Sequence, residues 1–127
     1  MAADVAEAAA LLRQLALAFP EAREDFPWGE RVMKVRDKVF VFMGSLEPGD
    51  TLHLSVKLKE TGADALTLPG ARPTGYGLGR AGWVSLSFPT GGPMPLDRLE
   101  GWLAESYRAV APKRLVTQWE RGKKGAP

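Results

Sequence analysis

The spacing of apolar residues changes twice along the chain, and this limits the possible folds more than any other feature. Between Val5 and Phe19, apolar residues recur at the three- and four-residue intervals of an amphipathic helix. Between Glu30 and Leu58 they recur at every second residue, which is typical of strands with one buried face. Helical spacing returns from Leu96 to Val110. Strands followed by helices predict an antiparallel sheet with helices packed on it.

Three consecutive antiparallel strands are expected in the middle of the chain. The first two, Glu30–Arg36 and Lys38–Met43, are joined by the tight turn Arg36-Asp37-Lys38. A second turn, Leu46–Asp50, leads to Thr51–Leu58, where apolar and polar residues alternate. The strand Lys38–Met43 is apolar on both faces, which predicts a central position in the sheet.

The remaining segments predict the element order α-β-β-β-α-β-α-α. They are a short helix after Thr61, an irregular segment over 69–82, a strand at Gly82–Phe88, a helix from Pro112 through Trp119, and a tail over 122–127. A short extra strand near Asp25–Trp28 is a further option. We therefore expect an α+β two-layer sandwich, with the helices on one face of the sheet and a single domain over residues 1–121.

The composition indicates a globular protein of a reducing compartment. A chain of 127 residues is long enough to bury one core, and it contains no cysteine for disulfides, thiolate zinc sites or a cysteine nucleophile. No signal peptide and no membrane-length apolar run are visible. We expect a cytoplasmic protein with no membrane partner. The sequence leaves the oligomeric state open, with a monomer favoured.

No pattern of residues predicts catalysis, a metal site or a cofactor. His53 is the single histidine, and its place on an alternating strand predicts an ordinary solvent-facing side chain. The glycines of Gly75–Gly79 precede a strand rather than a helix, so they predict a flexible loop and not a phosphate-binding loop. Asp97 and Glu100 are placed to favour the start of a helix through its dipole. We expect that the protein is not an enzyme.

Charge is distributed unevenly although the formal net charge is only +2. Residues 31–59 contain six basic and three acidic residues, and residues 101–127 contain six basic and two acidic residues. Residues 1–30 contain two basic and six acidic residues. Such segregation is found in proteins that bind polyanions, although it also arises from ordinary solvated surfaces.

The polar face of the predicted sheet is the best candidate for a binding surface. Alternation places Lys57, His53 and Ser55 of one strand and Trp83, Ser85 and Ser87 of another on this face. Trp83 either packs under a loop or helix, or forms part of a surface that holds bases and phosphates. The candidate nucleic-acid-binding residues are Arg36, Lys38, Lys57, Lys59, Arg72, Arg80 and Trp83.

Several short segments, taken in order, resemble the MmcQ/YjbR-like family of small bacterial proteins. They are Phe26-Pro27-Trp28-Gly29, Val32–Val35, Lys38–Phe40, Leu54–Leu58, Gly82-Trp83-Val84 and Leu103–Tyr107. The resemblance implies a two-layer fold like that of secretion chaperones and the CyaY-like group. It also implies DNA binding, which some members perform through paired β-hairpin wings. Here the second turn is acidic, with Glu47 and Asp50, which favours the sheet face and the Arg72–Arg80 loop instead.

Three functions remain open from the sequence. The first is a non-catalytic domain that binds DNA or another nucleic acid through the sheet face and basic loops. The second is an adaptor that binds a protein or peptide on the same face or on a sheet edge. The third is a small-molecule sensor or enzyme, which requires an enclosed pocket. The nature of the surface around Trp83 distinguishes the first two.

Overall fold

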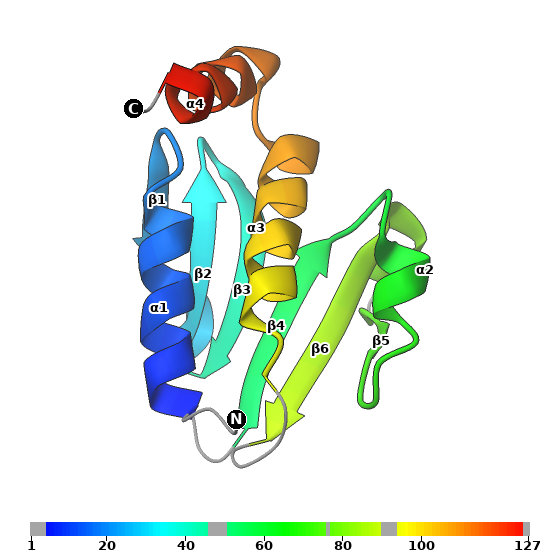
Figure 1. Cartoon of the computed structure of the whole chain (residues 1–127). Coiled ribbons are helices and arrows are strands. Elements are labelled where there is room, and N and C mark those ends of the chain that lie inside the picture. The colour runs from blue at the N-terminus through cyan, green and yellow to red at the C-terminus, as the bar shows by residue number, and fades with distance from the viewer. Residues whose placement is uncertain (1–4, 46–50, 76, 90–93, 126–127) are drawn as a thin grey trace.

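Six antiparallel strands form one sheet, and the helices lie on one side of it (Figure 1). The computed structural model describes residues 5–45, 51–75, 77–89 and 94–125. The strand order is β1-β2-β3-β4-β6-β5. The elements are α1 (Val5–Leu17), β1 (Ala22–Asp25), the 3-10 turn η1 (Pro27–Gly29), β2 (Glu30–Val35), β3 (Lys38–Ser45), β4 (Thr51–Lys57), α2 (Gly62–Ala65), β5 (Arg72–Pro73), the 3-10 turn η2 (Leu78–Ala81), β6 (Trp83–Pro89), α3 (Leu96–Val110) and α4 (Lys113–Gly125). The expected α+β fold is confirmed.

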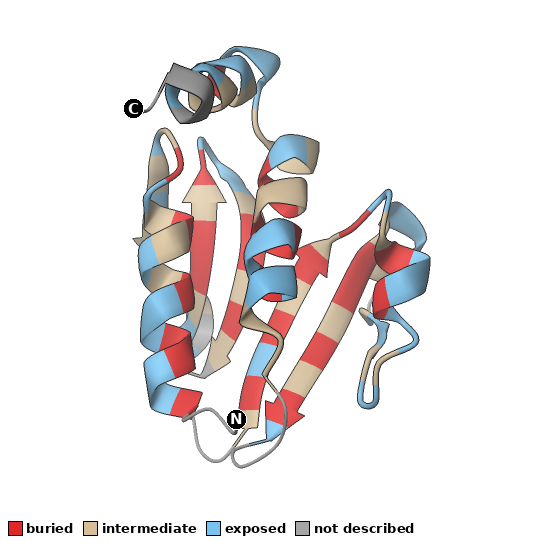
Figure 2. Cartoon of the chain, viewed as in Figure 1, coloured by how far each residue is buried: buried red, intermediate tan, exposed pale blue. Residues whose placement is uncertain are grey.

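Alternation along β4 and β6 separates the two faces of the sheet. Leu54 lies opposite Leu86 and Val56 lies opposite Val84, and all four side chains are buried beneath the helices. His53, Ser55 and Lys57 lie opposite Ser87, Ser85 and Trp83 on the other face, which we call the open face because none of the described helices covers it (Figures 1 and 2). The alternating pattern therefore placed both strands in the correct orientation.

Strand β3 is central and apolar on both faces, as its sequence predicts. Phe40 is fully buried beneath the helices, whereas Phe42 lies on the open face and contacts Trp83. The pairing of β3 with β2 shifts register between Met33 and Lys34, which is the signature of a β-bulge.

The helices are held on the sheet by an aromatic cluster around Tyr107. The Tyr107 ring stacks on Phe19 with centroids 4.6 Å apart and meets Phe40 edge-on at 5.4 Å. Its hydroxyl donates a hydrogen bond of 2.8 Å to the carbonyl oxygen of Pro20. Trp119 of α4 contacts both rings, with its centroid 5.1 Å from that of Phe19 and 6.3 Å from that of Tyr107. The cluster thereby joins α3, α4 and the chain after α1 to the sheet.

Ser106 bridges the two central strands at the point where their pairing stops. Strands β3 and β4 pair at Val41–Val56 and Phe42–Ser55. At the next position the buried Ser106 hydroxyl, carried by α3, donates to the carbonyl oxygen of Phe40 and accepts the backbone N–H of Lys57 at 2.8 Å. One side chain thus satisfies two backbone groups that have left the ladder.

The structure also differs from the sequence-based expectation at several elements. Strand β1 begins earlier than the optional strand near Asp25–Trp28, because residues 27–29 form a 3-10 turn. The irregular segment after Pro69 contains the two-residue strand β5 and the turn η2. Helix α4 continues past Trp119 to Gly125, so residues 122–125 are helical rather than part of a tail. The turn Leu46–Asp50 lies outside the described residues.

Glu24 joins three elements through two arginines. Its carboxylate accepts hydrogen bonds from Arg13 of α1 at 2.6 and 3.0 Å, and it forms an ion pair of 3.0 Å with Arg31 of β2. The hydrogen bond from Arg13 lowers the pKa of Glu24 below its usual value, the Coulombic attraction of Arg13 and Arg31 lowers it further, and partial burial opposes both. The folded state therefore favours the charged carboxylate.

Glu24→Gln is expected to lower the free energy of unfolding by about 1 kcal/mol at pH 7 and by less at pH 3. Because the pKa of Glu24 is depressed in the folded protein, its contribution is present above the unfolded pKa of about 4.3 and is lost as the pH falls. Urea unfolding of both proteins at pH 7 and pH 3 measures this difference. If the two proteins differed in free energy of unfolding by the same amount at both pH values, the ion pairs of the Glu24 carboxylate would not be the source of the difference.

Candidate nucleic-acid interface

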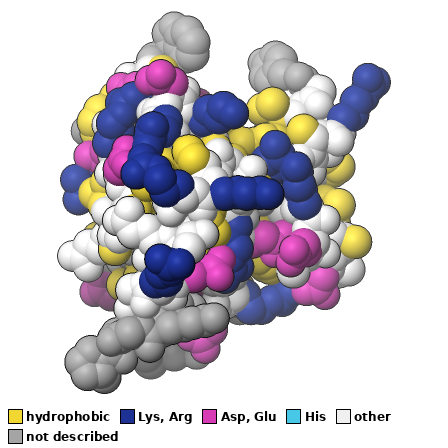
Figure 3. Space-filling model, turned by 90° about the horizontal axis from the view of Figure 1, so that it is seen from above, with side chains coloured by type: hydrophobic (Ala, Val, Ile, Leu, Met, Phe, Trp, Pro, Cys, Tyr) yellow, Lys and Arg dark blue, Asp and Glu magenta, His cyan; other side chains and the backbone are white. Residues whose placement is uncertain are grey.

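Basic side chains from five segments meet at one end of the molecule, which we call the basic end. It is the end that α4 covers, where β2 meets β3 and where β4 stops (Figures 1 and 3). Figure 3, which looks down on this end, shows Lys and Arg side chains spread across it, with Asp and Glu side chains among them. The basic residues are Arg36, Lys38, Lys57, Lys59, Arg80, Arg108, Lys113, Arg114 and Arg121.

Lys57, Lys59 and Arg80 are brought together by the backbone. The N–H of Leu58 donates a 2.8 Å hydrogen bond to the carbonyl oxygen of Gly82, which fixes the end of β4 beside the turn η2. Gly82 has a φ of 96°, a conformation that glycine adopts without strain. The three basic residues line an open hollow of about 460 Å³.

The β2–β3 turn supplies Arg36 and Lys38, as expected from the sequence. Arg36 adopts a left-handed conformation with a φ of 58° in this turn. Its guanidinium forms an ion pair of 2.8 Å with Glu21, whereas Lys38 is exposed at the start of β3. Arg36 is therefore partly neutralised.

Helix α4 contributes basic residues that our list of candidates missed. Lys113, Arg114 and Arg121 are exposed on it, and Arg108 lies at the end of α3 with its guanidinium 5.0 Å from the Trp119 ring. The excess of basic residues over 101–127 was the signal that could have identified them.

Many of these cations have no carboxylate partner. Within the described part of the chain, no ion pair reaches Lys38, Lys57, Lys59, Arg80, Lys113 or Arg121. Arg114 lies 4.0 Å from Glu21, and Arg108 lies 3.9 Å from Glu120. The described structure therefore leaves these six side chains available to anions.

Arg72 and Trp83, two further candidates from the sequence, lie on the open face. Arg72 lies opposite Ser85, part of the way along the open face. Trp83 lies on the open face, but only 8% of it is exposed, and its ring meets Phe42 edge-on at 5.3 Å. Trp83 therefore offers no free ring on which a base could stack, and of the two alternatives that the sequence left open the structure favours packing.

The rest of the open face is a polar hollow of about 270 Å³. Hydroxyl groups cross it in a chain, with Ser85 2.8 Å from Ser55 and 2.9 Å from Thr74. His53 is exposed and its Nδ1 lies 3.1 Å from the hydroxyl of Ser87, in keeping with a solvent-facing strand histidine. Arg72 borders this hollow.

The described residues contain no group of three or more potential metal ligands among His, Asp and Glu. In the same part of the chain, no helix has the length and apolar character needed to cross a membrane. Among its described side-chain hydrogen bonds, Ser85 contacts only the hydroxyls of Ser55 and Thr74, whereas Ser87 contacts the His53 ring.

Comparisons with known proteins identify the family. A search of the curated proteins found no match. The crystal structure of the Deinococcus radiodurans protein DR2400, described as a DUF419 domain, is similar to this chain with a TM-score of 0.65 and 26% sequence identity, covering 91% of this chain and 86% of that one. The YjbR family model matches residues 17–109, from the end of α1 nearly to the end of α3. The chain therefore belongs to the YjbR family.

Proposed function

We propose that this protein is a non-catalytic domain of the bacterial cytoplasm that binds nucleic acid through its basic end. The observation that carries the proposal is a set of lysines and arginines at one end, supplied by β3, β4, η2 and α4, that form no ion pair within the described part of the chain. Phosphate groups are the natural partners of such side chains, since each contact releases condensed counterions.

Double-stranded DNA is the favoured polyanion. Because Trp83 is buried, it cannot serve as the exposed aromatic ring that single-strand binding commonly uses. The duplex has the higher charge density, so the same set of cations gains more from it. Contacts to phosphates carry no sequence information, so we expect little sequence preference.

Affinity for a labelled duplex is expected to fall steeply with salt. If about four phosphates are contacted, the plot of log Kobs against log salt has a slope of roughly −3.6, and affinity falls about 150-fold between 50 and 200 mM salt. Fluorescence anisotropy with a duplex and a single strand of equal length measures both slopes. A flat titration at low salt, or clearly tighter binding to the single strand, would overturn the proposal.

A further inference from the structure

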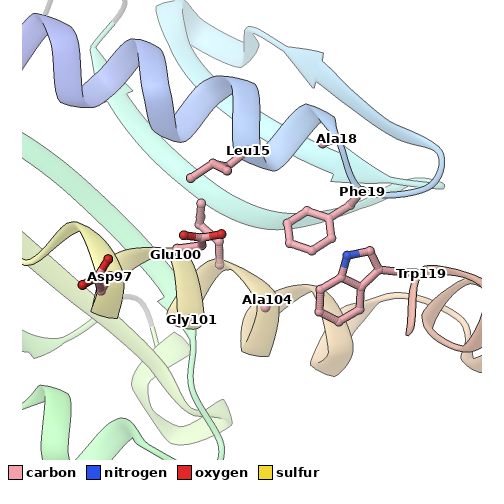
Figure 4. Close-up of a pocket in the computed structure, with 9 residues that line it drawn as sticks. Leu15, Ala18, Phe19, Asp97, Glu100, Gly101, Ala104 and Trp119 are labelled. Atoms are coloured by element: carbon pink, nitrogen blue, oxygen red, sulfur yellow. The ribbon is translucent and has the colours of Figure 1, made fainter. Parts of the chain in front are cut away.

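An apolar groove lies between α1 and α3, on the opposite side of the sheet from the open face. Its volume is about 440 Å³. Leu15 and Ala18 line one wall, and Gly101 and Ala104 of α3 line the other (Figure 4). Phe19 and Trp119 close the end near α4. Most of the groove is therefore hydrocarbon and aromatic surface.

The groove remains open because α3 carries small residues where it faces α1. A Cβ atom at Gly101 would meet nothing within 4 Å, so no neighbour in the described chain requires a glycine there. Glycine inside a helix costs about 1 kcal/mol relative to alanine. Leu11, one turn before Leu15 on α1, is 39% exposed and extends the apolar surface.

The other end of the groove is acidic. Asp97 and Glu100 line it, and neither forms an ion pair within the described part of the chain. Asp97 lies in the first turn of α3, where a carboxylate favours the helix dipole. Glu100 lies beyond that turn, contrary to the expectation that it favours the helix start, and it faces Leu15 across the groove (Figure 4). Its charge therefore has no partner in the helix dipole and is available to a ligand.

We propose that this groove binds an amphipathic helical segment of another protein, which carries a bulky aliphatic anchor and a lysine or arginine on the same face. The anchor lies against Ala104, Phe19 and Trp119, and the cation lies beside Glu100 and Asp97. Ala104 is four residues after Glu100 and seven after Asp97, so the separations along α3 are about 6 and 10 Å at 1.5 Å per residue. The anchor and cation are therefore separated by one or two helical turns. This mode is helix-in-groove recognition.

Defined synthetic peptides test the proposal. The probes are two alanine-based helical peptides with a central leucine, one carrying lysines four and seven residues after it and one carrying them before it. Matched peptides carry glutamates in place of the lysines. In NMR titrations we expect one lysine peptide to shift the amide signals of Gly101 and Ala104 and the indole signal of Trp119. The glutamate version is expected to bind at least about tenfold more weakly.

Variants of the protein separate the contributions of shape and charge. Ala104→Met should fill the groove and weaken the lysine peptide at least about tenfold, whereas Ala63→Met, the same change at an exposed residue of α2, should not. Asp97→Lys with Glu100→Lys should reverse the preference, so that the glutamate peptide binds more tightly. Circular dichroism shows whether each variant is folded.

Three results would overturn the proposal. The first is an absence of shifts in the groove at millimolar peptide, and the second is equal binding of lysine and glutamate peptides. The third is self-association of the protein that Ala104→Met abolishes, since this assigns the groove to a second copy of the chain. The duplex affinity of Ala104→Met should equal that of the unmodified protein, so a failure of this proposal is distinct from a failure of nucleic-acid binding.

Discussion

Ser106→Ala is expected to lower the free energy of unfolding by about 3 kcal/mol, which corresponds to a fall in Tm of roughly 10 °C for a domain of this size. The Ser106 hydroxyl is the hydrogen-bond partner of the Phe40 carbonyl and the Lys57 N–H, where β3 and β4 have separated. Alanine leaves both backbone groups buried and without a partner, and each costs about 1–3 kcal/mol. Urea and thermal unfolding measure the loss.

Ser85→Ala is the matched control, because it removes the same hydroxyl from a half-buried position on the open face. Ser85 contacts only the hydroxyls of Ser55 and Thr74 in its side-chain hydrogen bonds. Both partners can turn toward water, so we expect a cost below about 1 kcal/mol. Equal losses for the two variants would mean that Ser106 does not support the separated strands.

The sheet was predictable because the pattern that identifies each strand lies within that strand's own sequence. Each strand carries the alternation that separates its two faces, and the apolar run at Val39–Phe42 has to lie in the centre of a sheet. The role of Ser106 was not predictable, since its hydroxyl donates to the carbonyl oxygen of Phe40, which lies 66 residues away in the sequence. Only the crossing of α3 over β3 and β4 reveals this contact.

The candidate site was partly predictable for a topological reason. Turns that connect antiparallel strands gather at the ends of a sheet, so Lys38, Lys57 and Lys59 had to lie at one end or the other. Arg72 lies on the open face because β5 pairs alongside β6 rather than at its end. The exposure of Trp83 depends on a neighbour, Phe42, in another strand. Neither the pairing of β5 nor the burial of Trp83 can be predicted from neighbouring residues in the sequence.

The length of α4 escaped prediction because its last turns are polar and contain Gly122. A glycine with lysines after it is typical of a helix end. In the structure α4 nevertheless continues to Gly125, held to the domain by the buried Leu115 and the Trp119–Phe19 contact. Packing of the first half of α4 on the domain therefore stabilises the second half as a helix. The continued helix places Arg121 at the basic end.

The double variant Lys59→Ala with Arg80→Ala is expected to bind duplex DNA roughly 10–100-fold more weakly than the unmodified protein at 0.1 M salt. Both side chains are exposed and line the same hollow, and neither has a carboxylate partner in the described chain. Loss of two phosphate contacts should also reduce the magnitude of the salt slope by about 1.8. Anisotropy titrations at several salt concentrations give both quantities.

Arg72→Glu is the control that separates a local contact from net charge. It removes the same two units of positive charge as the double variant, but from the open face instead of the basic end. If phosphates lie at the basic end, Arg72→Glu should weaken binding much less and leave the salt slope nearly unchanged. Equal losses would show that overall charge alone attracts the duplex. A larger loss for Arg72→Glu would move the binding surface to the open face, where the hydroxyls of Ser55 and Ser85 become its next candidates.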